Sequence, residues 1–338
     1  MTTVPSTPVA TARHRLTPAS GATAMDATAP ARPTITEITT SRVDPYRDKV
    51  VHTYADDPED WRRALGDTCL FEWGIYEGAR RDISLGEAGI RFFDRQLHLA
   101  GLLEGPRPRF DRILDLGCGW GFITYLLARR FPDCPRIDAV NISERQLAYC
   151  ADYLADHDLA HRVNLYLCDG QDIDHLPAAD TPYDLVVIRG VYTHFTNEVF
   201  EASVAALAER ARSGTTVIIS DTLYKTLDGY RSSIPDDVDR VACGNRKTPA
   251  HFIRVLEQHG FAIDDLRVLP SNADVAHWFE QVKANIEHHF PHGVTGPLEE
   301  LSVMADNMCA ALHADRVSAH SVIAHFDRGQ PQGDRHGQ

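Results

Sequence analysis

The segment that decides the fold reads Arg112-Ile-Leu-Asp-Leu-Gly-Cys-Gly-Trp-Gly-Phe-Ile-Thr-Tyr-Leu-Leu-Ala-Arg-Arg130. A short apolar run meets a cluster of glycines and then takes on the periodicity of a helix. The pattern predicts a strand, a tight turn and a helix in direct succession. Gly117, Gly119 and Gly121 carry no Cβ, so the turn can approach a ligand closely where the helix presents free N–H groups.

The glycine spacing alone does not identify the ligand, because phosphate-binding and dinucleotide-binding loops share a Gly-x-Gly-x-Gly turn. The neighbouring residues narrow the choice. No Lys-Ser or Lys-Thr pair follows the glycines, which argues against a P-loop. Asp115 stands at the end of the predicted strand. The turn is therefore expected to hold a nucleotide-like ligand in some other way.

The segment Asp115–Gly121 resembles the first motif of the class I S-adenosylmethionine (SAM) dependent methyltransferases. Its Gly-Cys-Gly-Trp-Gly form is typical of the small-molecule branch, which contains cyclopropane fatty acid synthases and natural-product C-methyltransferases. The resemblance covers roughly residues 85 to 270. It implies a Rossmann-like α/β sheet, mostly parallel with an antiparallel last strand, and a SAM molecule whose methionine part packs on the glycine turn.

Composition favours small-molecule chemistry. The 338 residues are 43% hydrophobic, enough for a substantial core in one large domain with an extra lobe. The formal net charge of -14 works against a nucleic-acid or anionic-membrane partner, since both require clustered Lys and Arg.

The seven cysteines are scattered and include no Cys-x-x-Cys pair, so neither a disulfide framework nor a thiolate zinc site is indicated. No apolar run approaches the roughly 20 residues of a membrane span, and the N-terminus has no apolar signal core. We therefore expect a cytoplasmic protein. The alternative of an organelle-targeting leader is weakened by five prolines that interrupt the first 40 residues.

The chain divides into five parts by composition and pattern. The first is rich in Thr, Ala, Pro and Ser and is expected to be disordered. The predicted parts are a disordered leader (1–42), an N-terminal helical lid or cap (43–104), a SAM-binding core (105–270), substrate-side helices with the final strand (271–328) and a disordered tail (329–338).

The resemblance also implies which residues contact SAM. Family members generally place an acidic residue after the second strand to bind the ribose hydroxyls, but this chain has Asn141 there. An amide can still bond a hydroxyl, more weakly than a carboxylate; Asp138 is the alternative. Asp169 resembles the residue that accepts a bond from the adenine amino group. The cofactor residues predicted are Asp115, Gly117, Cys118, Gly119, Asn141, Gln146, Asp169, Gly170 and Arg189.

Substrate residues are expected where strands end and where aromatic residues gather. His194 and Tyr192 follow the fourth predicted strand (184–190) and are the candidate catalytic residues, His194 matching in position a histidine of the cyclopropane synthases. Asp221 and Tyr224 follow the fifth strand (215–220) in a predicted loop, ahead of a polar insertion over 225–247. Trp73 and Tyr76 belong to the aromatic segment of the lid. That segment is expected to close over the cofactor and substrate as a lid, or else to form the core of an N-terminal helical layer. An apolar lid so rich in aromatic residues would also suit a homo-oligomer.

Two helical segments precede the predicted last strand (316–326), and the first ends in a histidine cluster. His288 and His292 are spaced to chelate a divalent metal ion, although Pro291 coincides with the expected helix end. The alternative is a solvated helix terminus that interacts with its own dipole.

The function predicted is methylation of a small molecule of specialised metabolism, such as an antibiotic precursor. Carbon is the favoured acceptor, for example the β-carbon of an α-keto acid, whose enolate a metal would stabilise. The alternatives are a prenyl or acyl alkene carbon, an N- or O-acceptor, and a SAM-binding partner without turnover.

Overall fold

The computed structural model describes residues 32–39, 42–76, 81–227 and 240–327. The first 31 residues of the predicted leader, the predicted tail and most of the polar insertion lie outside the described residues. Among the helices that are described, none is both long and apolar enough to cross a membrane.

An eight-stranded sheet organises the described part of the chain, in the order β1-β4-β3-β2-β5-β6-β8-β7. Neighbours from β1 to β6 run parallel, whereas β8 runs antiparallel to both β6 and β7. This confirms the predicted Rossmann-like α/β fold. The strands are β1 (Ile35–Glu37), β2 (Ile113–Leu116), β3 (Ile137–Asn141), β4 (Val163–Leu167), β5 (Tyr183–Arg189), β6 (Ala211–Tyr224), β7 (Phe261–Val268) and β8 (Val317–Phe326).

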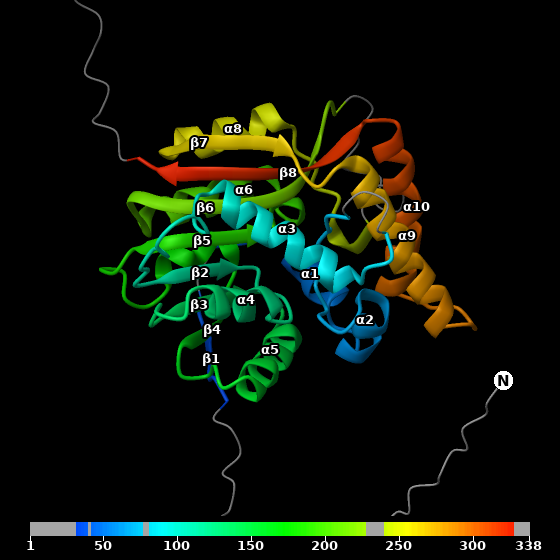
Figure 1. Cartoon of the computed structure of the whole chain (residues 1–338), viewed down its shortest axis with the longest axis horizontal. Coiled ribbons are helices and arrows are strands. Elements are labelled where there is room, and N and C mark those ends of the chain that lie inside the picture. Colours follow the sequence, from blue (N-terminus) through cyan, green and yellow to red (C-terminus); the bar gives the residue numbers. More distant parts are fainter. Residues whose placement is uncertain (1–31, 40–41, 77–80, 228–239, 328–338) are drawn as a thin grey trace, which may run out of the picture. The chain divides into compact units, whose positions relative to one another are not determined.

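Helices cover both faces of the sheet (Figure 1), as the continuous apolar runs of its central strands require. Ile113 of β2 faces a core shared with α3, α4 and α5, and the next residue, Leu114, faces the opposite core with α6 and α8. The helices are α1 (Arg47–Thr53), α2 (Pro58–Leu65), α3 (Leu85–Leu99), α4 (Phe122–Arg130), α5 (Glu144–Asp156), α6 (Asn197–Glu209), α8 (Pro249–Gln258), α9 (Asn272–His289) and α10 (Pro297–His313), with short 3-10 turns η1 (Gly170–His175), η2 (Tyr192–His194) and η3 (Arg240–Ala242).

A third core joins the N-terminal helices α1 and α2 to the C-terminal helices α9 and α10, beyond one end of the sheet (Figure 1). Trp61 of α2 and Trp278 of α9 are fully buried in it. The Asn285 side chain donates to the Ala64 carbonyl across this contact, at 3.0 Å. The predicted lid and the predicted inserted helices therefore build one cap together.

Two local predictions were wrong, and strand pairing is the reason in both cases. Residues 35–37 fall in the leader predicted to be disordered, yet they pair with β4 along an open sheet edge. The loop predicted from Asp221 to Tyr224 is instead the end of β6, because β8 pairs with β6 as far as Tyr224 and Val317.

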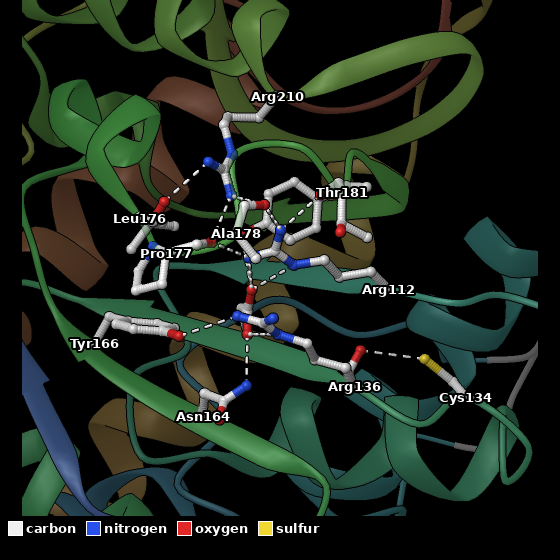
Figure 2. Close-up of polar contacts among 12 residues, drawn as sticks. Arg112, Cys134, Arg136, Asn164, Tyr166, Leu176, Pro177, Ala178, Thr181 and Arg210 are labelled. Carbon is white, nitrogen blue, oxygen red and sulfur yellow. Dashed lines mark hydrogen bonds and ion pairs between the residues drawn. The ribbon is translucent and has the colours of Figure 1, made fainter.

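Asp138 is buried in an ion network far from the carboxyl end of β3. Its carboxylate pairs with Arg112, both side chains being 0% exposed, and also accepts from Arg136, Asn164 and Tyr183. Figure 2 shows this network, in which Arg112 and Arg210 also donate to backbone carbonyls of residues 176–181. Asp138 precedes Asn141 by three residues, about 10 Å along a strand. The structure thus assigns Asp138 to structural support and excludes it as a ribose contact.

Candidate active site

A cavity of about 670 Å³ lies between the glycine turn, the strand ends and the cap. It brings together most of the site residues predicted from sequence, although they come from segments far apart in the chain. The predicted residues that line it are Trp73, Asp115, Gly117, Cys118, Gly119, Asn141, Gln146, Gly170, Arg189, His194 and Tyr224.

The glycine turn is shaped by the close approach of the next loop. Gly117 has φ +79°, and a Cβ there would lie 2.2 Å from Cγ2 of Val191, so any side chain would force Val191 to move. At Gly119, φ +53°, the nearest atom to such a Cβ is Nε2 of Gln146, at 3.8 Å. The first glycine therefore allows packing, whereas the second keeps the floor of the cavity open.

Three charged side chains gather beside this turn. The Glu72 carboxylate accepts from the Ser220 hydroxyl at 2.9 Å, and burial raises its pKa to about 7. Asp115 accepts from the Thr124 hydroxyl at 2.6 Å, and burial raises its pKa to about 7 as well. Arg189 donates to the Gln96 side chain, and burial lowers the pKa of its guanidinium.

Some of these charged atoms are left without partners. The Oε2 atom of Glu72 is buried with no hydrogen-bond partner among the described residues. The same holds for two nitrogens of Arg189, namely Nε and one of the two terminal nitrogens. Buried polar atoms are almost always paired, so each such atom calls for an explanation. A ligand carrying both an ammonium and a carboxylate, as the methionine end of SAM does, would satisfy them. The residues present therefore fit SAM.

Asn141 and Gln146 form a polar pair at the end of β3. The Asn141 amide donates to Oε1 of Gln146 at 2.8 Å, and both side chains line the cavity. Their remaining amide atoms suit two vicinal hydroxyl groups.

Asp169 lies just behind the cavity wall formed by Cys168 and Gly170. Its carboxylate accepts from the Gln171 backbone N–H at 3.1 Å and caps the turn η1, and burial raises its pKa to about 6. The structure thus shows a capping role, and contact with adenine stays a prediction.

His194 and Tyr54 form a pair in this wall that is suited to move a proton. Nδ1 of His194 lies 3.0 Å from the Ala242 carbonyl, which can only accept, so Nδ1 carries the hydrogen. Nε2 is then an acceptor, and the Tyr54 hydroxyl lies 3.3 Å from it. Both side chains line the cavity.

The turn that carries His194 is fixed on several sides. Asp221 accepts from the Thr193 N–H at 2.9 Å, and the Lys247 ammonium donates to the carbonyls of Tyr192 and Phe195 at 2.7 Å each. Asn245 donates to the His194 carbonyl at 3.0 Å. The imidazole is therefore held in one place, as a proton-transfer group requires.

Some predicted site residues do not line the cavity. Tyr192 is fully buried and packs against Phe200 and Phe252, so its placement gives no support to a catalytic role. Asp221 supports the His194 turn rather than facing a substrate. The Tyr76 hydroxyl donates to Gln281 at 2.5 Å, which fastens the lid segment to α9.

The predicted metal pair also lies elsewhere. His288 is at the C-terminal end of α9 and stacks edge-on with His289, whereas His292 follows the helix, and neither lines the cavity. Over residues 32–39, 42–76, 81–227 and 240–327, no three His, Cys, Asp or Glu side chains are grouped to hold a metal. Helix α9 ends at His289, so His292 does not share a helical face with His288.

Sequence reasoning missed Tyr54, Glu72, Arg240 and Arg246 as lining residues. Glu72 could have been noticed, because it is an acidic residue within the aromatic segment Cys69–Tyr76. The others carry no local signal, since they reach the cavity only through the packing of the cap.

Comparisons with known proteins find a methyltransferase domain in this chain. A model described as a methyltransferase domain matches residues 113–214. Ajmaline N-methyltransferase of Rauvolfia serpentina is 25% identical over 152 residues, which are 45% of this chain and 50% of the relative. The chain thus spans about half the length of this curated relative.

Solved structures match over more of the chain. A cyclopropane synthase from Mycobacterium tuberculosis has a TM-score of 0.70 at 15% identity and covers 84% of this chain and 100% of its own. A mycolic acid cyclopropane synthase complexed with S-adenosylhomocysteine (SAH) has a TM-score of 0.68 at 16% identity, covering 84% and 99%. At these identities the likeness shows the fold. The chain therefore contains a methyltransferase domain over residues 113–214, on a fold that it shares with these solved structures.

Proposed function

We propose that this chain methylates a small molecule of specialised metabolism, with an activated carbon, such as the β-carbon of an α-keto acid, as the favoured acceptor. The observation that carries the proposal is the Tyr54–His194 pair, which lines the same cavity as the glycine turn. SAM supplies an electrophilic methyl group when bound. The chain's own residues must then remove a proton from the acceptor and hold it in line.

The cofactor would be held from the residues described above. Glu72 would accept a hydrogen bond from the ammonium of SAM, and Arg189 would donate to the carboxylate of SAM. These bonds would pair the buried Glu72 and Arg189 atoms that otherwise have no partner among the described residues. Asn141 and Gln146 would bind the ribose hydroxyls. These contacts anchor the cofactor at both ends of the glycine turn.

The Tyr54–His194 pair would remove the proton from the acceptor. Burial raises the pKa of Tyr54 well above its ordinary value, so a free phenolate is disfavoured. The hydroxyl of Tyr54 would instead pass its proton to Nε2 of His194 while it accepts the acceptor's proton. The Ala242 carbonyl stabilises the imidazolium that results, because it still accepts from Nδ1. General bases of this kind contribute roughly 10²- to 10⁴-fold.

The histidine cluster at the end of α9 takes no part in this proton transfer. His288 and His292 lie outside the cavity lining, so a metal bound there could not contact an acceptor inside the cavity. Enolate formation therefore rests on the Tyr54–His194 pair.

Methylation of an alkene carbon is a second candidate, favoured by the aromatic rings around Tyr54. Trp120 lies edge-on to Tyr54 at 5.8 Å and Phe71 at 6.4 Å, and both line the cavity. Aromatic faces stabilise a nearby cation. These rings would stabilise a carbocation formed on a prenyl or acyl chain, and the Tyr54–His194 pair would then remove a proton from it.

The test is transfer of labelled methyl from SAM to a panel of acceptors, with chelator and again with added divalent ions. The panel contains phenylpyruvate and 4-methyl-2-oxopentanoate, which have β-hydrogens, and phenylglyoxylate, which has none. It also contains geranyl diphosphate, oleate and aromatic amines. Labelling of keto acids with β-hydrogens, and not of phenylglyoxylate, supports the proposal. Labelling of alkenes alone supports the second candidate, and SAM binding without labelling of any acceptor contradicts both.

A further inference from the structure

The N-terminal segment reaches the cavity along the edge of the sheet. β1 runs parallel to β4, and the Ile38 N–H donates to the carbonyl of Leu167, the last residue of β4, at 2.9 Å (Figure 1). Arg42 then donates to both carboxylate oxygens of Asp174 in η1, at 2.7 Å each. Because parallel strands end at the same edge, the residues that follow lie at the carboxyl end of β4.

The order of the strands indicates where the adenine of SAM would lie. In the proposed binding mode the methionine end contacts Arg189, at the end of β5, and the ribose contacts Asn141, at the end of β3. β2 with its glycine turn lies between these two strands, and β4 follows β3 on the other side, about 4.8 Å further along the sheet. The adenine, which is attached to the ribose, would therefore contact the wall formed by Cys168 and Gly170, just after β4.

Asp44 contributes a carboxylate to the cavity from the N-terminal segment. Its Oδ1 accepts from the Tyr46 N–H at 2.8 Å, whereas Oδ2 is buried and has no hydrogen-bond partner among the described residues. Burial raises the pKa of Asp169 to about 6, and the charge of Asp44 adds to this rise, so the two carboxylates lie near each other. Asp44 is thus at the end of the cavity where the adenine would lie, and its Oδ2 calls for a donor.

The neighbouring Asp169 is in a different situation. It lies behind the cavity wall, and its carboxylate already accepts from the Gln171 N–H. Ionised carboxylates only accept hydrogen bonds. A wall with Asp44 in it and Asp169 behind it therefore favours a ligand group that only donates. The exocyclic amino group of adenine is such a group, whereas the carbonyl that replaces it in hypoxanthine only accepts.

We propose that Oδ2 of Asp44 accepts a hydrogen bond from the exocyclic amino group of the cofactor's adenine. This inference rests on the proposed function and adds to it a residue that selects the cofactor by its nucleobase. Helix α1 begins three residues after Asp44, at Arg47, and Tyr54 follows its last residue. The bond would therefore tie the adenine to the helix that positions the Tyr54–His194 pair.

The test measures the affinity of the full chain at pH 8 for three cofactor products, by isothermal titration calorimetry. The probes are SAH, the analogue with unsubstituted purine in place of adenine, and S-inosylhomocysteine, which carries hypoxanthine. Loss of one hydrogen bond to a charged group costs roughly 10- to 100-fold in affinity. The native chain should bind SAH at least tenfold tighter than the purine analogue, and S-inosylhomocysteine should bind weakest.

The Asp44→Asn variant should invert this order. The Tyr46 N–H would keep the amide oxygen in the place of Oδ1, so the amide nitrogen would replace Oδ2 and donate. The variant should then bind S-inosylhomocysteine tighter than SAH. Asp48→Asn, at an exposed position of α1, removes a carboxylate from the same segment and is the matched control, which should keep the native order.

Three results would overturn the inference while the proposed function stands. These are equal binding of the three probes by the native chain, an unchanged order in Asp44→Asn, and loss of the preference for SAH in Asp48→Asn as well. A preference that survives in Asp44→Asn and disappears in Asp169→Asn would assign the adenine contact to Asp169 instead. Failure of the native chain to bind SAH at all would contradict the proposed function, and this inference with it.

Discussion

Replacement of Glu72 by Gln should stabilise the ligand-free chain and weaken its cofactor binding at the same time. Glu72 as a residue is 3% exposed, and one carboxylate oxygen has a partner in Ser220 whereas the other has none among the described residues. Glutamine has the same shape and keeps an oxygen for the Ser220 hydroxyl. The substitution therefore removes a buried charge without opening a cavity.

The stability effect follows from the pKa. Burial raises the pKa of Glu72 from 4.5 to about 7, and each pH unit corresponds to about 1.4 kcal/mol, so the ionised side chain costs the fold about 3 kcal/mol. A carboxyl whose pKa is raised in the folded state imposes no cost below pH 4.5, where it is protonated in both states. The cost grows as pH rises and is complete above about pH 7. At pH 8 the variant should thus be more stable by up to about 3 kcal/mol.

The binding effect has the opposite sign. A charge-assisted hydrogen bond to an ammonium contributes about 1.5 to 3 kcal/mol, so SAH should bind the variant roughly 10- to 150-fold more weakly at pH 8. Below about pH 7 the Glu72 carboxyl of the native chain becomes protonated, so the affinity of the native chain for SAH should fall. SAH binding by the variant should depend less on pH than binding by the native chain. Some dependence should remain, because burial raises the pKa of Asp115 to about 7 and this carboxyl still changes its charge in the same pH range.

Urea unfolding and calorimetric titration of SAH, each at pH 5 and pH 8, measure both effects. Glu209→Gln, at an exposed position of α6, is the matched control and should change neither. A variant that loses stability at pH 8, or that binds SAH as tightly as the native chain, would refute the assignment of Glu72 to the ammonium site.

Tyr54→Phe removes the hydroxyl that contacts His194 and keeps the ring, so kcat should fall about 100-fold with SAH affinity unchanged; an unaltered kcat would exclude the proton route. Asp138→Asn leaves Arg112 buried without its charge partner, which should cost about 3 to 5 kcal/mol in urea unfolding; a loss below about 1 kcal/mol would show that this ion pair matters little. His288→Ala and His292→Ala, both outside the cavity lining, should leave methyl transfer unchanged with or without divalent ions. A metal-dependent loss in either would restore the predicted metal site.

The sequence by itself determined the sheet and the cofactor end of the cavity. Apolar runs and the glycine turn are local patterns, so β2, the turn and α4 could be predicted from one continuous segment. Parallel strands bring their carboxyl ends to one edge, which is why residues after separate strands, such as Asn141, Gly170 and His194, were expected together. The cap helices were also expected, because aromatic and amphipathic segments flank the core.

Only the tertiary structure decided how the other half of the cavity is built. Tyr54 meets His194, and Arg246 meets Tyr224, across more than a hundred and about twenty residues of chain respectively, and no periodicity encodes such contacts. The same packing buries Tyr192 in the core, and it places Asp221 where it accepts a hydrogen bond from the turn that carries His194. Burial also set the charges of the site, since the raised pKa of Glu72 depends on what surrounds it rather than on its neighbours in sequence.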